Sequence, residues 1–128
     1  MPAEHLADTG RCGSCKAVLP PLAEPIDVDP VAFDGIVQNA RVPVLVDFWA
    51  SWCAPCRMAA PEVEALARDI AGKAVVLRAD TEKYPDLAAR FRIQGIPHFV
   101  VLRSGQVVFQ RAGVASRDEM RRWIEQPT

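Results

Sequence analysis

The feature that constrains this chain most is a strand-like apolar run that leads directly into two cysteines at the expected start of a helix. The run VLVDFWASWCAPCR covers residues 44–57 and contains Cys53 and Cys56. Branched and aromatic residues up to Trp49 predict a buried strand. Pro55 favours a helix start, because the fixed φ of proline suits the first turn. A Cys-x-x-Cys pair at such a junction indicates thiol–disulfide chemistry.

The position of the two cysteines predicts what each one does. Unpaired backbone N–H groups and the positive end of the helix dipole favour a thiolate over a thiol at a helix start. Since the thiolate is the nucleophile in disulfide exchange, Cys53 is predicted to attack a partner's disulfide, and Cys56 to resolve the mixed disulfide. Trp49 and Trp52 flank the pair with apolar surface. Half of a structural zinc site is the alternative, but a strand that runs directly into a helix favours redox chemistry.

Composition limits the classes of function. The 128 residues suit one domain with its own core. The net charge of −1 and the sequence pI near 6.1 argue against nucleic-acid and membrane-surface partners. No apolar run approaches the roughly 18 residues of a membrane span, and the N-terminus lacks a basic-then-apolar signal, so we expect a cytoplasmic protein. There, four cysteines favour catalysis or metal binding over structural disulfides.

The chain divides into an N-terminal arm, residues 1–25, and a folded domain, residues 26–128. The arm contains a second Cys-x-x-Cys pair and ends in a proline-rich linker. In the domain, apolar periodicity and turn signals predict alternating strands and helices, hence an α/β fold with a mixed sheet and helices on both faces. Pro61 is predicted to kink the second helix without ending it. The predicted strands are 26–28, 42–50, 74–79, 97–103 and 106–111; the predicted helices are 30–40, 54–71, 85–91 and one that opens with a capping box at Ser116.

Asp47 lies in the middle of an apolar strand, an expensive position for a carboxylate without a partner. One interpretation is a strand residue that is hydrogen-bonded to the backbone. The other is a buried carboxyl with a raised pKa that moves protons for Cys56. The second is favoured, because desolvated carboxyls close to reactive thiols are candidates for functional sites.

Over roughly residues 26–127 the sequence resembles the thioredoxin family. The resemblance rests on DFWA at 47–50, WCAPC at 52–56 and IQGIP at 93–97, with Pro61, Gly105 and Gly113 at matching spacings. It implies the family's three-layer fold and a protein-disulfide reductase that exchanges dithiol for disulfide. It further implies disulfide-containing protein substrates, recycling by a thioredoxin reductase, a monomer and no cofactor.

The resemblance also assigns residue roles. It implies that Asp47 transfers a proton and that Pro97 forms a cis peptide bond beside the cysteines. The residues that it implies for substrate binding are Trp52, Gly95, Ile96, Gly113 and Val114. Two positions depart from the family: Arg78 replaces a frequent lysine, and His98 replaces a usual threonine. Arg78 stays charged. His98 is predicted to be a tolerated residue at the start of a strand; the alternative is a histidine that adds pH dependence beside the thiolate.

Two other functions on the same fold remain as alternatives. A disulfide oxidase or isomerase is one; Ile96 and the missing export signal argue against it. A redox-inert module that binds zinc or protein is the other. The intact Cys53, Cys56 and Asp47 argue against inertness.

Cys12 and Cys15, in the arm, resemble the second half of the N-terminal zinc ribbon of one bacterial thioredoxin subfamily. Two thiolates cannot complete a tetrahedral structural zinc site. His5 is a conceivable third ligand, and only another chain could supply a fourth without destroying the redox pair. We therefore expect no zinc bound within one chain. The pair is then vestigial or the remainder of a truncated ribbon, with an accessory dithiol as the alternative.

Overall fold

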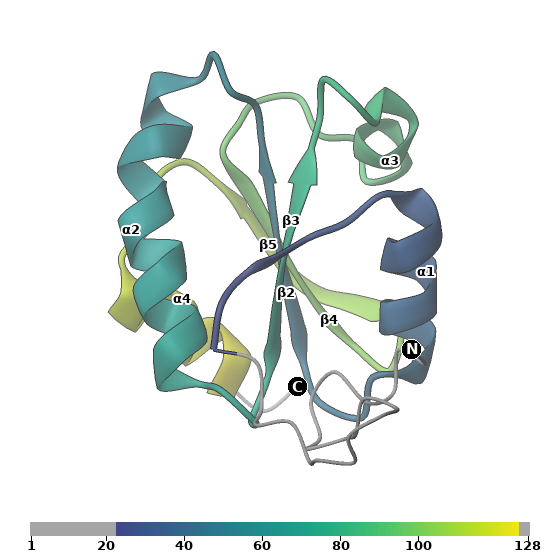
Figure 1. Cartoon of the computed structure of the whole chain (residues 1–128), viewed down its shortest axis with the longest axis vertical. Helices are drawn as coiled ribbons and strands as arrows, with labels where there is room; N and C mark the ends of the chain where they lie inside the picture. Colours follow the sequence, from purple (N-terminus) through teal and green to yellow (C-terminus); the bar gives the residue numbers. More distant parts are fainter. Residues whose placement is uncertain (1–22, 126–128) are drawn as a thin grey trace, which may run out of the picture.

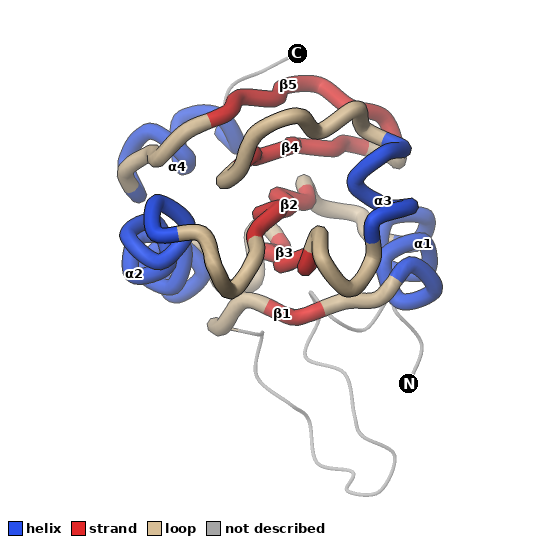
Figure 2. Tube along the Cα trace, turned by 90° about the horizontal axis from the view of Figure 1, so that it is seen from above, coloured by secondary structure: helices blue, strands red, loops and turns tan. Residues whose placement is uncertain are grey.

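The computed structural model describes residues 23–125, so Cys12 and Cys15 lie outside the described residues. Its helices and strands follow one another as the sequence predicts, and their ends agree with the predicted ones to within two residues. Figures 1 and 2 show a central sheet with helices on both faces, which confirms the predicted three-layer α/β fold. The elements are β1 (Ile26–Asp27), α1 (Pro30–Asn39), β2 (Val44–Trp49), α2 (Ala54–Asp69), β3 (Val75–Asp80), α3 (Pro85–Arg90), β4 (His98–Arg103), β5 (Gln106–Ala112) and α4 (Arg117–Glu125).

The sheet has the strand order β1-β3-β2-β4-β5. The strands β1, β3 and β2 are parallel, whereas β4 pairs antiparallel with both β2 and β5. The mixed sheet expected from the sequence is thereby confirmed. The strand β2, which leads into the cysteines, lies in the middle of the sheet and is buried along almost its whole length. The redox pair therefore follows directly after a buried central strand that is paired on both edges.

Figure 2 shows α2 and α4 on one face of the sheet and α1 and α3 on the other, and an apolar core lies on each face. On one side, α2 and α4 pack against residues that include Leu45, Phe99 and Val101. On the other, α1 and α3 pack against the residues that alternate with these, such as Val46, Phe48 and Val100. The period-2 alternation of a strand explains this division, because successive side chains point to opposite faces.

The helix ends follow sequence signals. Asp29 caps α1 by accepting a 2.7 Å hydrogen bond from the Ala32 backbone N–H. The capping box before α4 is confirmed: the Glu119 N–H donates to the Ser116 hydroxyl at 3.1 Å, and the Ser116 N–H donates to the Glu119 carboxylate at 3.0 Å. The helix α2 runs through Pro61 to Asp69, so this proline does not end it.

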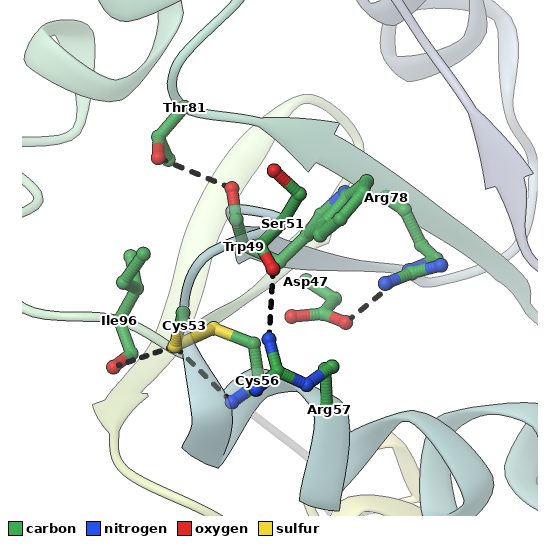
Figure 3. Close-up of a disulfide and its surroundings, with 9 residues drawn as sticks. All are labelled: Asp47, Trp49, Ser51, Cys53, Cys56, Arg57, Arg78, Thr81 and Ile96. Atoms are coloured by element: carbon green, nitrogen blue, oxygen red, sulfur yellow. Dashed lines mark hydrogen bonds and ion pairs between the residues drawn. A yellow bond between two sulfur atoms is a disulfide. The ribbon is translucent and has the colours of Figure 1, made fainter.

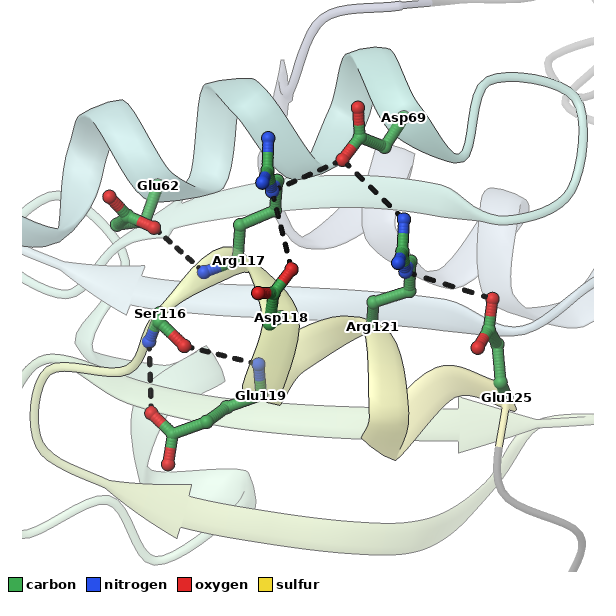
Figure 4. A network of polar contacts seen from close by, with 8 residues as sticks. All are labelled: Glu62, Asp69, Ser116, Arg117, Asp118, Glu119, Arg121 and Glu125. Atoms are coloured by element: carbon green, nitrogen blue, oxygen red, sulfur yellow. Dashed lines mark hydrogen bonds and ion pairs between the residues drawn. The ribbon is translucent and has the colours of Figure 1, made fainter.

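A polar network joins α4 and the residue before it to α2 (Figure 4). Asp69 forms ion pairs with two arginines of α4, with its Oδ2 3.2 Å from Arg117 Nε and 3.8 Å from Arg121 Nη1. The Arg117 backbone N–H donates to Glu62 at 2.8 Å. Exposed ion pairs of this kind each contribute only about 0.2–1 kcal/mol to stability. The apolar contacts of α4 with the core therefore hold this helix in place more than the polar network does.

Leu66 tests how far α2 depends on that core. It lies in the last turn of α2, where it is fully buried against the sheet-facing core. Substituting Leu66→Ala should lower the free energy of unfolding by about 2–5 kcal/mol, because it removes apolar contacts and leaves a cavity. Leu66→Met, which conserves volume, should cost less than about 1.5 kcal/mol. Urea unfolding of both variants is the measurement, and a loss below about 1 kcal/mol for the alanine variant would contradict this packing.

Candidate redox site

Cys53 and Cys56 form a disulfide at the start of α2, with their Cα atoms 5.3 Å apart. Cys53 is the N-cap residue, and its Sγ accepts a hydrogen bond from the Cys56 backbone N–H at 3.1 Å (Figure 3). Only 3% of Cys53 and 2% of Cys56 is exposed. Because a sulfur in this position faces the unpaired N–H groups of the first turn, the helix favours a thiolate there once the disulfide is reduced.

The turn between β2 and α2 is fixed by two contacts that the sequence does not indicate. The Arg57 guanidinium donates to the Ser51 carbonyl at 2.8 Å, and the Thr81 hydroxyl donates to the Trp49 carbonyl at 3.1 Å (Figure 3). Arg57 could have been suspected, since it directly follows the cysteine pair. Thr81 could not, because it lies at the end of the neighbouring strand and only the fold brings it to this turn.

The loop before β4 lies against Cys53. The Ile96–Pro97 peptide bond is cis, as the resemblance implies. The Ile96 carbonyl oxygen is 3.7 Å from Cys53 Sγ (Figure 3). The Gly113 N–H donates to the Pro97 carbonyl at 2.8 Å, and Gly113 has a φ of +102°, a region that favours glycine. Pro97 and Gly113, distant from the cysteines in sequence, are therefore neighbours of the same site.

A groove of about 450 Å³ opens beside the disulfide. Trp52, which is 63% exposed, lies at its rim. Among the described residues that line the groove, none carries a charge. They are Trp52, Cys53, Ala54, Pro55, Thr81, Ala88, Ile93, Gln94, Gly95 and Ile96. Three residues of the predicted substrate surface thus line it, while Gly113 and Val114 do not; Val114 is 41% exposed.

Asp47 is buried beneath the disulfide, with 1% of the residue exposed. Arg78 Nε lies 3.6 Å from Asp47 Oδ2, which is an ion-pair distance but too long for a hydrogen bond. Within residues 23–125, neither carboxylate oxygen has a hydrogen-bond donor. Burial raises the pKa of Asp47 to about 6, and the positive charge of Arg78 offsets part of that rise.

Arg78 is itself held from two sides. Its guanidinium lies over the Trp49 ring, 4.2 Å from the ring centroid. In the sheet it is the Cα partner of Asp47 on β2 and of Asp27 on β1, so an arginine stands between two carboxylates in one row across three strands. Figure 3 shows the Asp47 carboxylate between the disulfide and this guanidinium. The sequence locates Arg78 opposite Asp47, but not its stacking on Trp49.

His98 opens β4, as predicted. Its Nε2 is 3.0 Å from the Gln110 amide oxygen on β5. The ring is therefore engaged in a contact between neighbouring strands, and this agrees with its interpretation as a tolerated strand residue.

Within the part of the chain that the structure describes, no three His, Cys, Asp or Glu side chains gather closely enough to hold a metal ion. Nor does any described helix have the length and apolarity to cross a membrane.

A disulfide at the start of a helix, in a fold of this topology, defines the class of thiol–disulfide oxidoreductases. The chain matches the Thioredoxin family over residues 24–126. Thioredoxin 1 of Chlorobaculum tepidum is 39% identical over 91 residues, which are 71% of this chain and 90% of that protein. Thioredoxin C-3 of Corynebacterium nephridii is 36% identical over 126 residues, 98% of this chain and 86% of that protein. A solved mutant thioredoxin from Halobacterium salinarum has a TM-score of 0.76 at 31% identity, covering 82% of this chain and 91% of its own. This chain belongs to the thioredoxin family.

The raised pKa of Asp47 predicts a pH-dependent gain in stability when this carboxyl is removed. Its pKa rises from 3.8 to about 6 in the folded protein, so ionisation of Asp47 opposes folding increasingly as the pH rises through that interval. Asp47→Ala should therefore stabilise the protein more at pH 8 than at pH 4, by about 2 kcal/mol. Urea unfolding at both pH values measures the difference. An equal effect at the two pH values would contradict the raised pKa.

Proposed function

We propose that this chain reduces protein disulfides by dithiol–disulfide exchange through Cys53 and Cys56, as its family does. The observation that carries the proposal is the Cys53 sulfur at the N-cap of α2, where it accepts the Cys56 N–H beside an uncharged groove. The helix start favours the nucleophile, and the groove offers a surface on which a partner polypeptide can lie.

The reaction proceeds in two exchanges. The Cys53 thiolate attacks one sulfur of the substrate disulfide, a mixed disulfide forms, and the other substrate sulfur leaves as a thiolate that takes up a proton. Cys56 then loses its proton, attacks Cys53 Sγ and releases the second substrate sulfur. The substrate ends with two thiols and the protein with the Cys53–Cys56 disulfide that the structure contains.

Asp47 is proposed to accept the proton of Cys56 in the second exchange. Its support is position: the carboxylate is buried next to the disulfide (Figure 3) and has no hydrogen-bond donor among the described residues. A pKa of about 6 suits a base that must take up a proton and give it back near neutral pH.

The predicted substrate surface is proposed to surround the disulfide. Trp52, Gly95 and Ile96 line the groove, and Pro97 is tied to Gly113 by a backbone hydrogen bond. The exposed Val114 follows Gly113 and would extend the apolar contact. Within this surface, the group closest to the attacking Cys53 sulfur is the Ile96 carbonyl oxygen, at 3.7 Å.

The reducing partner is proposed to be a thioredoxin reductase, as thioredoxins are recycled by such enzymes. A cytoplasmic location, an electron-carrier role and a monomeric state stay predictions.

The roles of the two cysteines can be separated by substitution. In an insulin-reduction assay with NADPH and a thioredoxin reductase, Cys53→Ser should abolish activity, because the nucleophile is gone. Cys56→Ser should still attack but should accumulate mixed disulfides, since nothing resolves them. Non-reducing electrophoresis and mass spectrometry measure the trapped species. If Cys53→Ser trapped partners and Cys56→Ser did not, the two roles would be reversed; no reduction by the unmodified protein would refute the proposed function.

The N-terminal arm, residues 1–25, is proposed to be an appendage that is related to a half zinc ribbon. The alignment with Thioredoxin C-3 supports a shared arm, because it spans 98% of this chain. We still expect no structural zinc within one chain, because such a site needs four ligands and the arm has only two cysteines.

Elemental analysis tests the arm. The purified monomer should carry well under one equivalent of zinc, and deleting residues 1–25 should leave insulin reduction unchanged. One tightly held zinc per chain would contradict this expectation and point to His5 and a further ligand. Half an equivalent per chain, lost on mutating Cys12, would indicate one metal shared by two arms.

A further inference from the structure

A second cavity, separate from the substrate groove, opens between the β1 edge of the sheet and α2. Its volume is about 470 Å³, and no described residue lines both cavities. Figure 2 shows β1 at the edge of the sheet, with the residues that precede it next to α2. We call this cavity the charged cleft, because most of its lining is ionic. The described lining residues are Ala23, Glu24, Pro25, Asp27, Glu64, Arg68 and Arg78.

Arg78 joins the charged cleft to the redox site. Its side chain is 21% exposed and lines the cleft, while its Nε lies 3.6 Å from the buried Asp47 carboxylate. Asp47 itself does not line the cleft. The guanidinium therefore stands between the water of the cleft and the carboxyl, and its stacking on Trp49 keeps it there. Since an arginine does not give up its proton in a protein, any proton that moves this way passes beside Arg78 through water.

The charged cleft lies away from the surface that a substrate would cover. Glu64 and Arg68 follow Cys53 by about three and four turns of α2, which places them roughly 16 and 22 Å along the helix. A partner seated on Trp52 and the groove would exclude water from the thiols and leave the cleft open. The second exchange takes place while that partner is still attached through its mixed disulfide.

The proton of Cys56 then needs an acceptor. On resolution, Cys56–SH and the Asp47 carboxylate become a thiolate and a carboxylic acid. Asp47 can accept this proton only in its ionised form, so a protonated Asp47 must first release its own proton to water while the partner is still attached. The charged group in contact with it is Arg78 on β3, and the cysteines at the start of α2 become titratable once they are reduced. The other charged residues on this side line the cleft: Asp27, Glu24, Glu64 and Arg68. On β4 its Cα partner is the apolar Phe99. Only the Arg78 side of the carboxyl thus leads to a described opening other than the groove.

We propose that the charged cleft is the route by which Asp47 exchanges its proton with water while a substrate protein covers the thiols, and that Arg78 is the positioning residue at its inner end. This rests on the proposed function, since it concerns the resolution step. It assigns a role to a cavity that takes no part in substrate contact. Arg78 then does two things: it keeps a fixed positive charge beside Asp47, and it forms the inner end of the cleft.

The first test closes the cleft. Glu64→Trp should fill it from the α2 side, and Glu64→Gln removes the charge at nearly constant volume. Gln38→Trp, on the exposed side of α1, is the matched control for an added tryptophan. Rapid-mixing measurements with insulin should show that Glu64→Trp slows resolution of the mixed disulfide about fivefold or more, with the first attack unchanged. The two controls should stay within about twofold of the unmodified protein.

Comparing a large substrate with a small one distinguishes a blocked proton route from a general structural effect of the Glu64→Trp substitution. With a small disulfide such as oxidised glutathione, water reaches the thiols directly, so Glu64→Trp should resolve at the unmodified rate. Equal slowing with both substrates, or no slowing with either, would overturn the proposal. Either result leaves insulin reduction intact, whereas failure of the proposed function itself appears as no reduction and no trapped intermediate.

The second test addresses Arg78 and does not depend on the tryptophan variant. Arg78→Met keeps an apolar stem but removes the charge that lowers the pKa of Asp47, so the pH profile of resolution should move upward by about one unit. Arg78→Lys should restore the profile. Arg78→Ala opens the inner end, and imidazole buffer should then accelerate resolution of the insulin mixed disulfide. Arg90→Ala, which removes an exposed arginine paired with Asp34, is the control. No shift with Arg78→Met and no buffer effect with Arg78→Ala would refute the role of Arg78.

Discussion

The redox site depends above all on one hydrogen bond, from the Cys56 backbone N–H to the Cys53 sulfur. It makes a reactive side chain the cap of α2, so the same contact that starts the helix also prepares the nucleophile. The helix is held by its buried face against the central strands, and β2 delivers Cys53 to this position. Fold and chemistry are therefore joined at one residue, because moving the start of the helix would also move the sulfur.

The buried Asp47 shows the cost of that arrangement. A carboxyl with 1% exposure and no hydrogen-bond donor among the described residues weakens the fold near neutral pH. Arg78 compensates in part, and it does so at an ion-pair distance that leaves the pKa of Asp47 at about 6. A tighter pair would stabilise the carboxylate further and, in the proposed role of Asp47, make it a poorer base. If Asp47 transfers the proton as proposed, the separation between the two groups balances stability against proton transfer.

Much of the fold could be predicted from the sequence, because apolar periodicity is local. The strand before Cys53, the helix through Pro61 and the capping box at Ser116 all follow from nearby residues. The position of Asp47 in a buried strand could be predicted in the same way. The groove could not be predicted as fully, because nothing in the local sequence marks Thr81, Ala88 and Ile93 as neighbours of the cysteines. The packing of α3 and the parallel pairing of β2 with β3 bring them there. The charged cleft depends likewise on where β1 lies relative to α2.

The uncharged lining of the groove has a kinetic consequence. Long-range attraction between proteins requires charge near the contact surface, and such attraction weakens as salt screens it. The described residues that line the groove contribute no charge of their own to such attraction. Under the proposed function, a partner that lies in the groove is held there by apolar and backbone contacts. The lining itself therefore gives the rate at which such a partner dissociates little dependence on ionic strength.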